Sequence, residues 1–152
     1  SYSMTGWRIG YLVTNKELAA QIFKIHDSMV TCPTAASQYG AIAAITGPKN
    51  SVKEFKKAYE KRREICMEEF AKTDKIQVAK PQGAYYIFPK FKKPVDDFKL
   101  ALEMVEKAKV AVVPGSAFGK GGENHIRISY CYAEETLKEG LRRFVDYVNK
   151  EL

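Results

Sequence analysis

Apolar residues recur at helical spacing in three successive segments of the first half of the chain. A capping-box pattern at Thr14 predicts the start of the first helix. This helix is expected to stop near Val30, because Pro33 has no N–H to continue it. An alanine-rich helix is predicted over 34–46, and a longer helix over 51–72. The longer helix has one apolar side and one charged side, and it is long enough to link two bodies.

After residue 75 the pattern changes to short apolar segments that are typical of strands. Strands are predicted over 76–78, 84–88, 110–113 and 126–131, and a further strand is predicted near the start of the chain, over 9–13. Two helices alternate with them. One begins at Asp96 and has an apolar face of Phe98, Ala101, Leu102 and Val105, and the other begins near Glu134. Alternating helices and short strands favour an α/β fold with a small sheet covered by helices.

Composition narrows the class of protein. Apolar residues make up 45% of the chain and charged residues 28%, as in an ordinary globular protein. No apolar run approaches the roughly 20 residues that span a bilayer, and the start lacks a secretion signal. We therefore expect a cytoplasmic protein that does not bind membranes. The net charge is +7, but lysines alternate with glutamates along the helices, which favours solvated helix faces over a nucleic-acid surface.

Cysteine and histidine spacing favours neither disulfides nor a metal site. Cys32, Cys66 and Cys131 lie far apart and are odd in number, so free thiols are expected. His26 and His125 have no partner ligands at metal-binding spacing.

The opening segment S-Y-S-M-T-G-W-R-I-G holds the first candidate for chemistry. Arg8 stands between Gly6 and Gly10, which would let a ligand approach the backbone closely. A guanidinium there is a planar fork of donors for a phosphate or a carboxylate. From the residues alone, an arginine flanked by glycines is more often an ordinary turn residue.

Arg127 is the second candidate. In the alternating segment 126–131, Ile126, Ile128 and Tyr130 share one face, and Arg127 lies on the other. A charge in a half-buried strand needs a partner. The partner could be a carboxylate of the protein, water on an exposed face, or an anionic ligand.

Taken in order, these stretches resemble class I aminotransferases, the pyridoxal-phosphate enzymes of the aspartate aminotransferase family. In that family a Schiff-base lysine is followed, after two free residues, by a small residue, an apolar residue, and then Gly-x-Arg-aliphatic-Gly. Ser3, Met4, Gly6, Arg8 and Ile9-Gly10 fit this pattern, so the lysine would immediately precede Ser1. The stretches P-Q-G-A-Y-Y, V-P-G-S-A-F-G and I-R-I-S-Y occur in the family's order too.

The resemblance implies an architecture. It identifies the chain as the C-terminal portion of a fold-type I pyridoxal-phosphate-dependent transferase. Residues 1–50 would be the end of the large cofactor-binding domain. Residues 51–152 would be the linking helix and the small α/β domain, which has a short, mainly antiparallel sheet. The loop at Thr34 would reach toward a second subunit, so a homodimer is expected.

It also implies roles for residues. Arg8 would bind the phosphate of pyridoxal 5'-phosphate, with Ser1 close by. Arg127 would bind the substrate α-carboxylate through a bidentate fork, and Gly83 and Tyr85 would lie near the substrate. No residue of 1–152 would be catalytic, since the lysine precedes Ser1. Pro114–Gly119 is interpreted as a mobile connection without a chemical role.

The expected activity is transfer of an amino group between an L-amino acid and a 2-oxo acid by a longer parent chain. The 152 residues alone would be inactive. Lyases of the same fold share these motifs. Two alternatives are an aminotransferase-like sensor domain of a transcription regulator and a catalytically silent dimerisation module.

Overall fold

The computed structural model describes all of residues 1–152, and its contacts divide the chain into two units, Ser1–Phe55 and Lys56–Leu152. The division falls inside one continuous helix, α3 (Asn50–Phe70). The predicted domain boundary at residue 51 therefore stays a prediction. No helix is long and apolar enough to cross a membrane.

The first unit consists of helices and irregular chain. It contains the short 3-10 turn η1 (Thr5–Trp7), then α1 (Lys16–Met29), α2 (Ala35–Thr46) and the start of α3. The helix positions confirm the sequence prediction, but α1 is capped by Asn15, whose side chain accepts from the Leu18 N–H at 2.8 Å, and not by Thr14.

The predicted strand over 9–13 is wrong. These residues have no regular structure, and Tyr11, Leu12 and Val13 are exposed. A strand is stabilised by a ladder of hydrogen bonds to a neighbour, and no strand exists in the first unit to pair with this segment. Arg8 consequently follows a 3-10 turn and does not enter a strand.

The second unit is an α/β domain built on two small antiparallel sheets. Strands β1 (Ile76–Gln77) and β3 (Lys90–Phe91) form one pair. Strands β2 (Tyr86–Ile87), β5 (Ile126–Ser129) and β4 (Val113–Pro114) form a three-stranded sheet with β5 in the centre. The fold confirms the predicted small α/β domain with a short antiparallel sheet.

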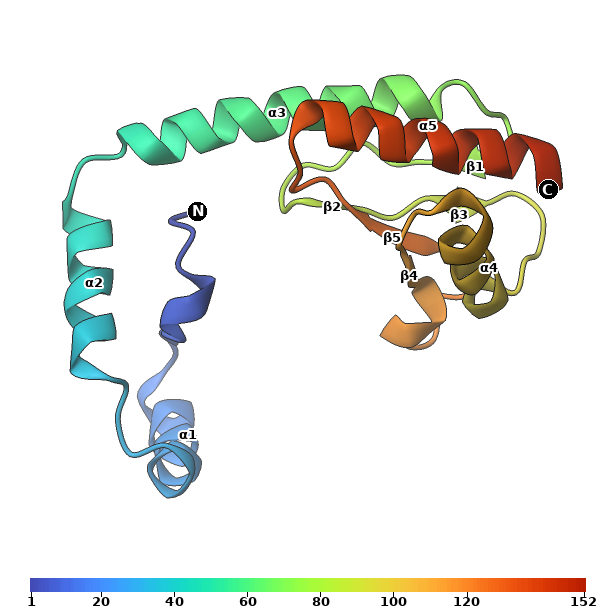
Figure 1. Ribbon diagram of the computed structural model, residues 1–152. Coiled ribbons are helices and arrows are strands. Elements are labelled where there is room, and N and C mark those ends of the chain that lie inside the picture. Colours follow the sequence, from blue (N-terminus) through green and yellow to red (C-terminus); the bar gives the residue numbers. More distant parts are fainter. The chain divides into compact units, whose positions relative to one another are not determined.

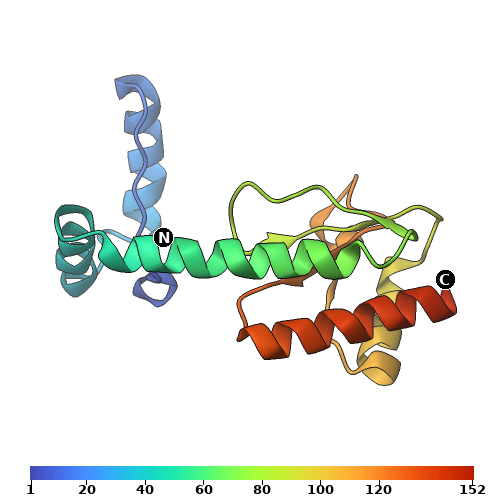
Figure 2. The same ribbon diagram turned by 90° about the horizontal axis from the view of Figure 1, so that it is seen from above.

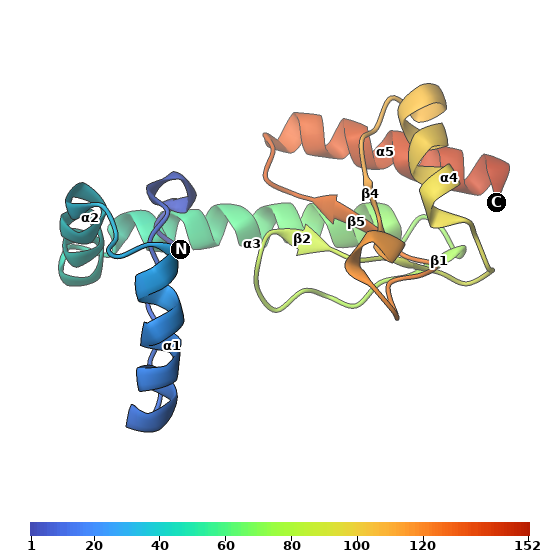
Figure 3. The ribbon, with the colours of Figure 1, turned by 90° about the horizontal axis from the view of Figure 1, so that it is seen from below.

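Helix α5 (Glu134–Glu151) and the C-terminal part of α3 lie along the same side of these strands (Figures 1 and 2). The apolar positions of α5 recur at helical spacing, and they are buried: Leu137, Leu141, Phe144, Val145 and Val148. On α3, Ile65, Cys66 and Phe70 face the same core. Helix α4 (Asp97–Glu103) lies beside β4, as Figure 3 shows.

Helix α4 begins where the sequence indicates, with the Asp96 side chain accepting from the Lys99 N–H at 3.0 Å. Its predicted apolar face is wrong except for Ala101. Helix α4 buries Leu100 and Ala101 and leaves Phe98 and Leu102 exposed. In the π-helical turn η2 (Met104–Ala108) that follows, Met104 is buried and Val105 is exposed. Asp97 is itself buried. The buried face therefore runs through Asp97, Leu100 and Met104, one position before the residues that were predicted to form it.

Candidate functional site

Arg127 lies on β5, the central strand of the three-stranded sheet. Ile126 and Ile128 are buried, whereas Arg127 and Ser129 are half-buried on the opposite face, as the alternation predicted. The sheet therefore presents one guanidinium on a face that is otherwise free of charged residues from this strand.

Two aromatic rings flank the Arg127 guanidinium. Its central carbon lies 4.3 Å from the ring centre of Tyr86 and 4.7 Å from that of Phe118. Both distances are within the range of cation–π contacts. The Arg127 side chain forms no ion pair and no hydrogen bond with any residue of the chain. The possibility of a local carboxylate partner is thereby removed, and the N–H donors of Arg127 are free for an external anion.

The segment that carries Phe118 is tied to α4 and β5. In the 3-10 turn η3 (Gly115–Phe118), the Ser116 N–H and hydroxyl both donate to the Asp97 carboxylate, at 3.0 and 2.7 Å. The Gly115 N–H donates to the His125 carbonyl oxygen at 2.9 Å. A buried carboxylate and a backbone hydrogen bond thus hold the Gly115–Ser116 part of this segment, and the interpretation of Pro114–Gly119 as a mobile connection stays a prediction.

Gly83 and Tyr85 lie on the approach to β2, and Tyr85 immediately precedes Tyr86. Ala84 takes a positive φ of 60°, and its carbonyl oxygen accepts from the Tyr130 hydroxyl at 2.9 Å. The ring of Tyr85 lies against that of Tyr86, with centroids 4.5 Å apart. A hydrogen bond to Tyr86 raises the pKa of Tyr85. Tyr85 is therefore linked to Arg127 through Tyr86, whose ring contacts both residues. Gly83 lies in open space, because a Cβ added to it would meet no atom within 4 Å.

Arg8 is placed by the first unit alone. It ends η1 with a left-handed φ of 50°, is exposed, and donates only to the Thr5 carbonyl oxygen, at 3.4 Å. The neighbouring Trp7 is fixed on α2, because the Ser37 hydroxyl donates to its carbonyl oxygen at 2.8 Å. Arg8 has no carboxylate partner, so this arginine is compatible with binding a phosphate. Ser1 is exposed, and its role stays a prediction.

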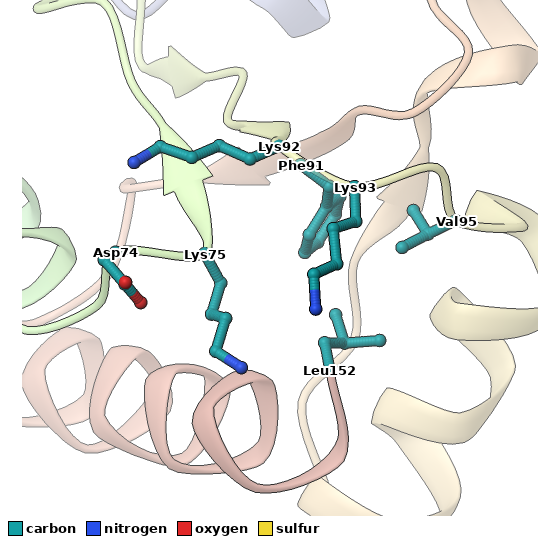
Figure 4. A pocket seen from close by; sticks show the side chains of 7 residues that line it. All are labelled: Asp74, Lys75, Phe91, Lys92, Lys93, Val95 and Leu152. Carbon is teal, nitrogen blue, oxygen red and sulfur yellow. The ribbon is translucent and has the colours of Figure 1, made fainter.

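Arg127 does not line the cavities of the second unit that are lined by Lys75, by Lys107 and by Val110. One cavity of about 280 Å³ is lined by Asp74, Lys75, Phe91, Lys92, Lys93, Val95 and Leu152. Figure 4 shows the side chains of Lys75 and Lys93 beside Leu152 in this cavity. No group of three or more His, Cys, Asp or Glu side chains is arranged to hold a metal ion.

Sequence reasoning did not connect Tyr86 or Phe118 with Arg127. The only signal in the sequence was the aromatic residue in the V-P-G-S-A-F-G stretch. Its closeness to Arg127 depends on strand pairing between β4 and β5, which sequence spacing does not reveal.

Comparison with known proteins places the chain in a family. The family model described as "Aminotransferase class I and II" matches residues 1–144. A "Probable aspartate/prephenate aminotransferase" of Aquifex aeolicus is 48% identical over 149 residues, covering 94% of this chain and 37% of the relative. A "Probable N-acetyl-LL-diaminopimelate aminotransferase" of Bacillus subtilis is 38% identical over 152 residues, covering 99% of this chain and 38% of the relative.

Solved structures of aminotransferases are also similar to this chain. An aromatic aminotransferase from Pyrococcus horikoshii is similar with a TM-score of 0.85 at 35% identity, covering 97% of this chain and 40% of that protein. The chain therefore spans about two fifths of the length of the proteins it matches. The coverage and the α/β architecture are those of a C-terminal portion, and the chain belongs to the class I and II aminotransferases.

Proposed function

We propose that this chain is the C-terminal part of a longer pyridoxal-phosphate-dependent aminotransferase that moves an amino group between an L-amino acid and a 2-oxo acid. The observation that carries the proposal is the Arg127 guanidinium, which has no anionic partner within the chain and is flanked by two rings. The family match supports the reaction class.

In this proposal Arg127 binds the α-carboxylate of the substrate through a bidentate pair of N–H···O bonds. A fork of this kind holds an amino acid in one orientation, and a lysine ammonium would supply charge without that orientation. Gly83 and Tyr85 border the same substrate on the side of β2.

Arg8, with Ser1 beside it in sequence, would hold the phosphate of the cofactor. The fit rests on an exposed guanidinium that has no carboxylate to neutralise it. When bound, pyridoxal phosphate supplies an electron-accepting ring that stabilises charge on the substrate α-carbon. Since the family's Schiff-base lysine corresponds to the position before Ser1, we expect residues 1–152 alone to be inactive. We expect the complete enzyme to be a homodimer.

The test uses the complete gene product that contains these residues. Amino transfer to 2-oxoglutarate is measured with L-aspartate, L-alanine and L-tyrosine as donors, for the unaltered protein and for Arg127→Gln and Arg127→Lys. We expect both variants to lose most of kcat/KM, and Arg127→Lys to recover little of it. Arg8→Gln should release cofactor, seen as loss of its absorbance after dialysis. Unaltered protein that retains cofactor but transfers no amino group would instead indicate a sensor or a silent dimerisation module.

A further inference from the structure

We propose that Tyr86 and Phe118 act as positioning residues, an aromatic clamp that orients the Arg127 guanidinium for the substrate carboxylate, with Asp97 fixing Phe118 through Ser116. The inference rests on the proposed function, because it assigns a task to Arg127 in substrate binding. To the residues of the proposed function it adds positioning residues, which affect the substrate only through Arg127.

The clamp solves a problem that a carboxylate-binding arginine faces. An arginine side chain is long and loses considerable conformational entropy when it is fixed. A carboxylate of the protein could fix it, but that carboxylate would occupy the donors and neutralise the charge that the substrate needs. Aromatic rings contact the flat faces of a guanidinium and leave its N–H edge free. The Arg127 guanidinium shows this combination, with two ring contacts and no hydrogen bond within the chain.

The topology brings the two rings to Arg127 from opposite flanks of β5. On one flank, Tyr86 of β2 pairs with Ser129, which lies two positions along the same face as Arg127. On the other flank, Val113 of β4 pairs directly with Arg127, and η3 follows β4 immediately. Since β5 is the central strand, side chains from both of its neighbours can reach Arg127.

Phe118 is held more firmly than its surface position implies. It is 50% exposed, yet its turn is tied to Asp97, which is 5% exposed and accepts both hydrogen bonds from Ser116. Its ring also meets that of Phe88 edge-on, with centroids 6.0 Å apart, and Phe88 stacks on His125 at 4.8 Å. A buried carboxylate that is paired with a single residue of a surface turn fixes that turn, and here the turn presents Phe118 to Arg127.

The experiment compares substrates that differ only in the group Arg127 would bind. In the complete gene product, kcat and KM are measured for the best amino donor among L-aspartate, L-alanine and L-tyrosine and for its α-carboxamide. The variants are Phe118→Leu and Tyr86→Leu, which remove a ring, and Phe118→Tyr and Tyr86→Phe, which keep one. Phe98→Leu is the matched control, because Phe98 is an exposed phenylalanine whose ring forms no cation–π contact with Arg127 and no aromatic pair with Phe118.

We expect each Leu variant to raise KM for the acid and lower its kcat/KM by roughly tenfold, the middle of the range for a cation–π contact. The carboxamide should be unaffected, so the preference for acid over amide falls. The ring-preserving variants and Phe98→Leu should keep that preference. Asp97→Ala should reduce it in the same way as Phe118→Leu. Calorimetric titration with succinate should show the same weakening without turnover.

Two outcomes separate the failure of this inference from the failure of the proposed function. If Arg127→Gln abolishes the preference for acid over amide while both Leu variants keep it, Arg127 binds the carboxylate and the clamp is disproved. If Arg127→Gln also keeps the preference, Arg127 does not bind the carboxylate, and the proposed function and the clamp fall together. Equal losses with acid and amide in both Leu variants leave the preference unchanged, and this outcome also contradicts the clamp.

Discussion

The rings of Phe70 and Phe144 meet edge-to-face, with centroids 5.9 Å apart and planes at 83°. Phe70 is the last residue of α3, and Phe144 lies in the middle of α5. Both are almost completely buried. This pair joins the two long helices of the second unit over its core, and edge-to-face geometry adds to the burial of the rings themselves.

We expect residues 56–152 to fold as an independent domain and residues 1–55 to remain unfolded on their own. Every residue of the buried hydrophobic cluster lies at Ile65 or beyond, whereas Ser37 is the only buried residue before residue 56. With no fully buried apolar side chain, the first unit cannot offset the conformational entropy lost on folding.

Circular dichroism of the two peptides checks this. We expect residues 56–152 to show a cooperative thermal transition and residues 1–55 to show none. A cooperative transition of 1–55 in isolation would contradict the reasoning.

Replacing Phe144 by Ala in residues 56–152 should lower the free energy of unfolding by about 3–5 kcal/mol, because it leaves a cavity and removes the contact with Phe70. Urea denaturation measures the change. Phe98→Ala serves as the control. Its ring is 62% exposed, so its loss is expected to cost below about 1 kcal/mol. Equal costs for the two replacements would mean that Phe144 is not part of the core.

Much of the helical structure could be predicted from the sequence because helix signals are local. The predicted start near Glu134 and the apolar spacing of α5 are confirmed. Strands are different, because their limits depend on partners far away in the sequence. The predicted strand 110–113 is reduced to Val113–Pro114, where the chain pairs with Ile126 and Arg127.

The same distinction applies to the candidate site. Arg127 could be singled out from a short motif, and its free N–H edge agrees with the role that the resemblance implies. Phe118 could not be connected with it, because that connection runs through β4–β5 pairing and through Asp97, nineteen positions before Ser116. The left-handed backbone of Arg8 was equally hidden, since positive φ is uncommon outside glycine.

Gly115→Ala should destabilise residues 56–152 by about 1–3 kcal/mol through overpacking. A Cβ at Gly115 would overlap the Gly122 carbonyl oxygen and would lie 2.8 Å from the His125 Cβ. The backbone must then shift at the start of η3. Gly140→Ala is the control, and it is expected to raise the free energy of unfolding. Gly140 lies within α5, and its added Cβ would meet no atom within 4 Å, so about 0.5–1 kcal/mol of stabilisation is expected.

Both changes are measured by urea denaturation of residues 56–152. If Gly115→Ala is neutral or stabilising, the close approach of the Gly115 and Gly122 backbones is not a feature of the folded protein.

Cys66 should make the second unit less stable as the solution becomes alkaline. Burial raises the pKa of this thiol from 9.0 to about 12. Below pH 9 the thiol is protonated in both the folded and the unfolded chain, so its contribution to stability is fully present. Between pH 9 and about 12 only the unfolded chain loses the proton, and the free energy of unfolding falls by up to about 1.4 kcal/mol per pH unit.

Urea denaturation of residues 56–152 at several pH values, with and without Cys66→Ala, isolates this effect. The replacement removes apolar contacts and lowers stability at pH 7, but it also removes the titrating group. The difference in stability between the two proteins should therefore shrink from pH 9 to pH 11. Burial, and to a smaller extent the nearby Cys66 thiol, also raise the pKa of Tyr130; because that tyrosine is present in both proteins, only the smaller Cys66-dependent part remains in the difference. A difference that stays constant over this range would show that the Cys66 thiol ionises as readily in the folded protein as in the unfolded chain.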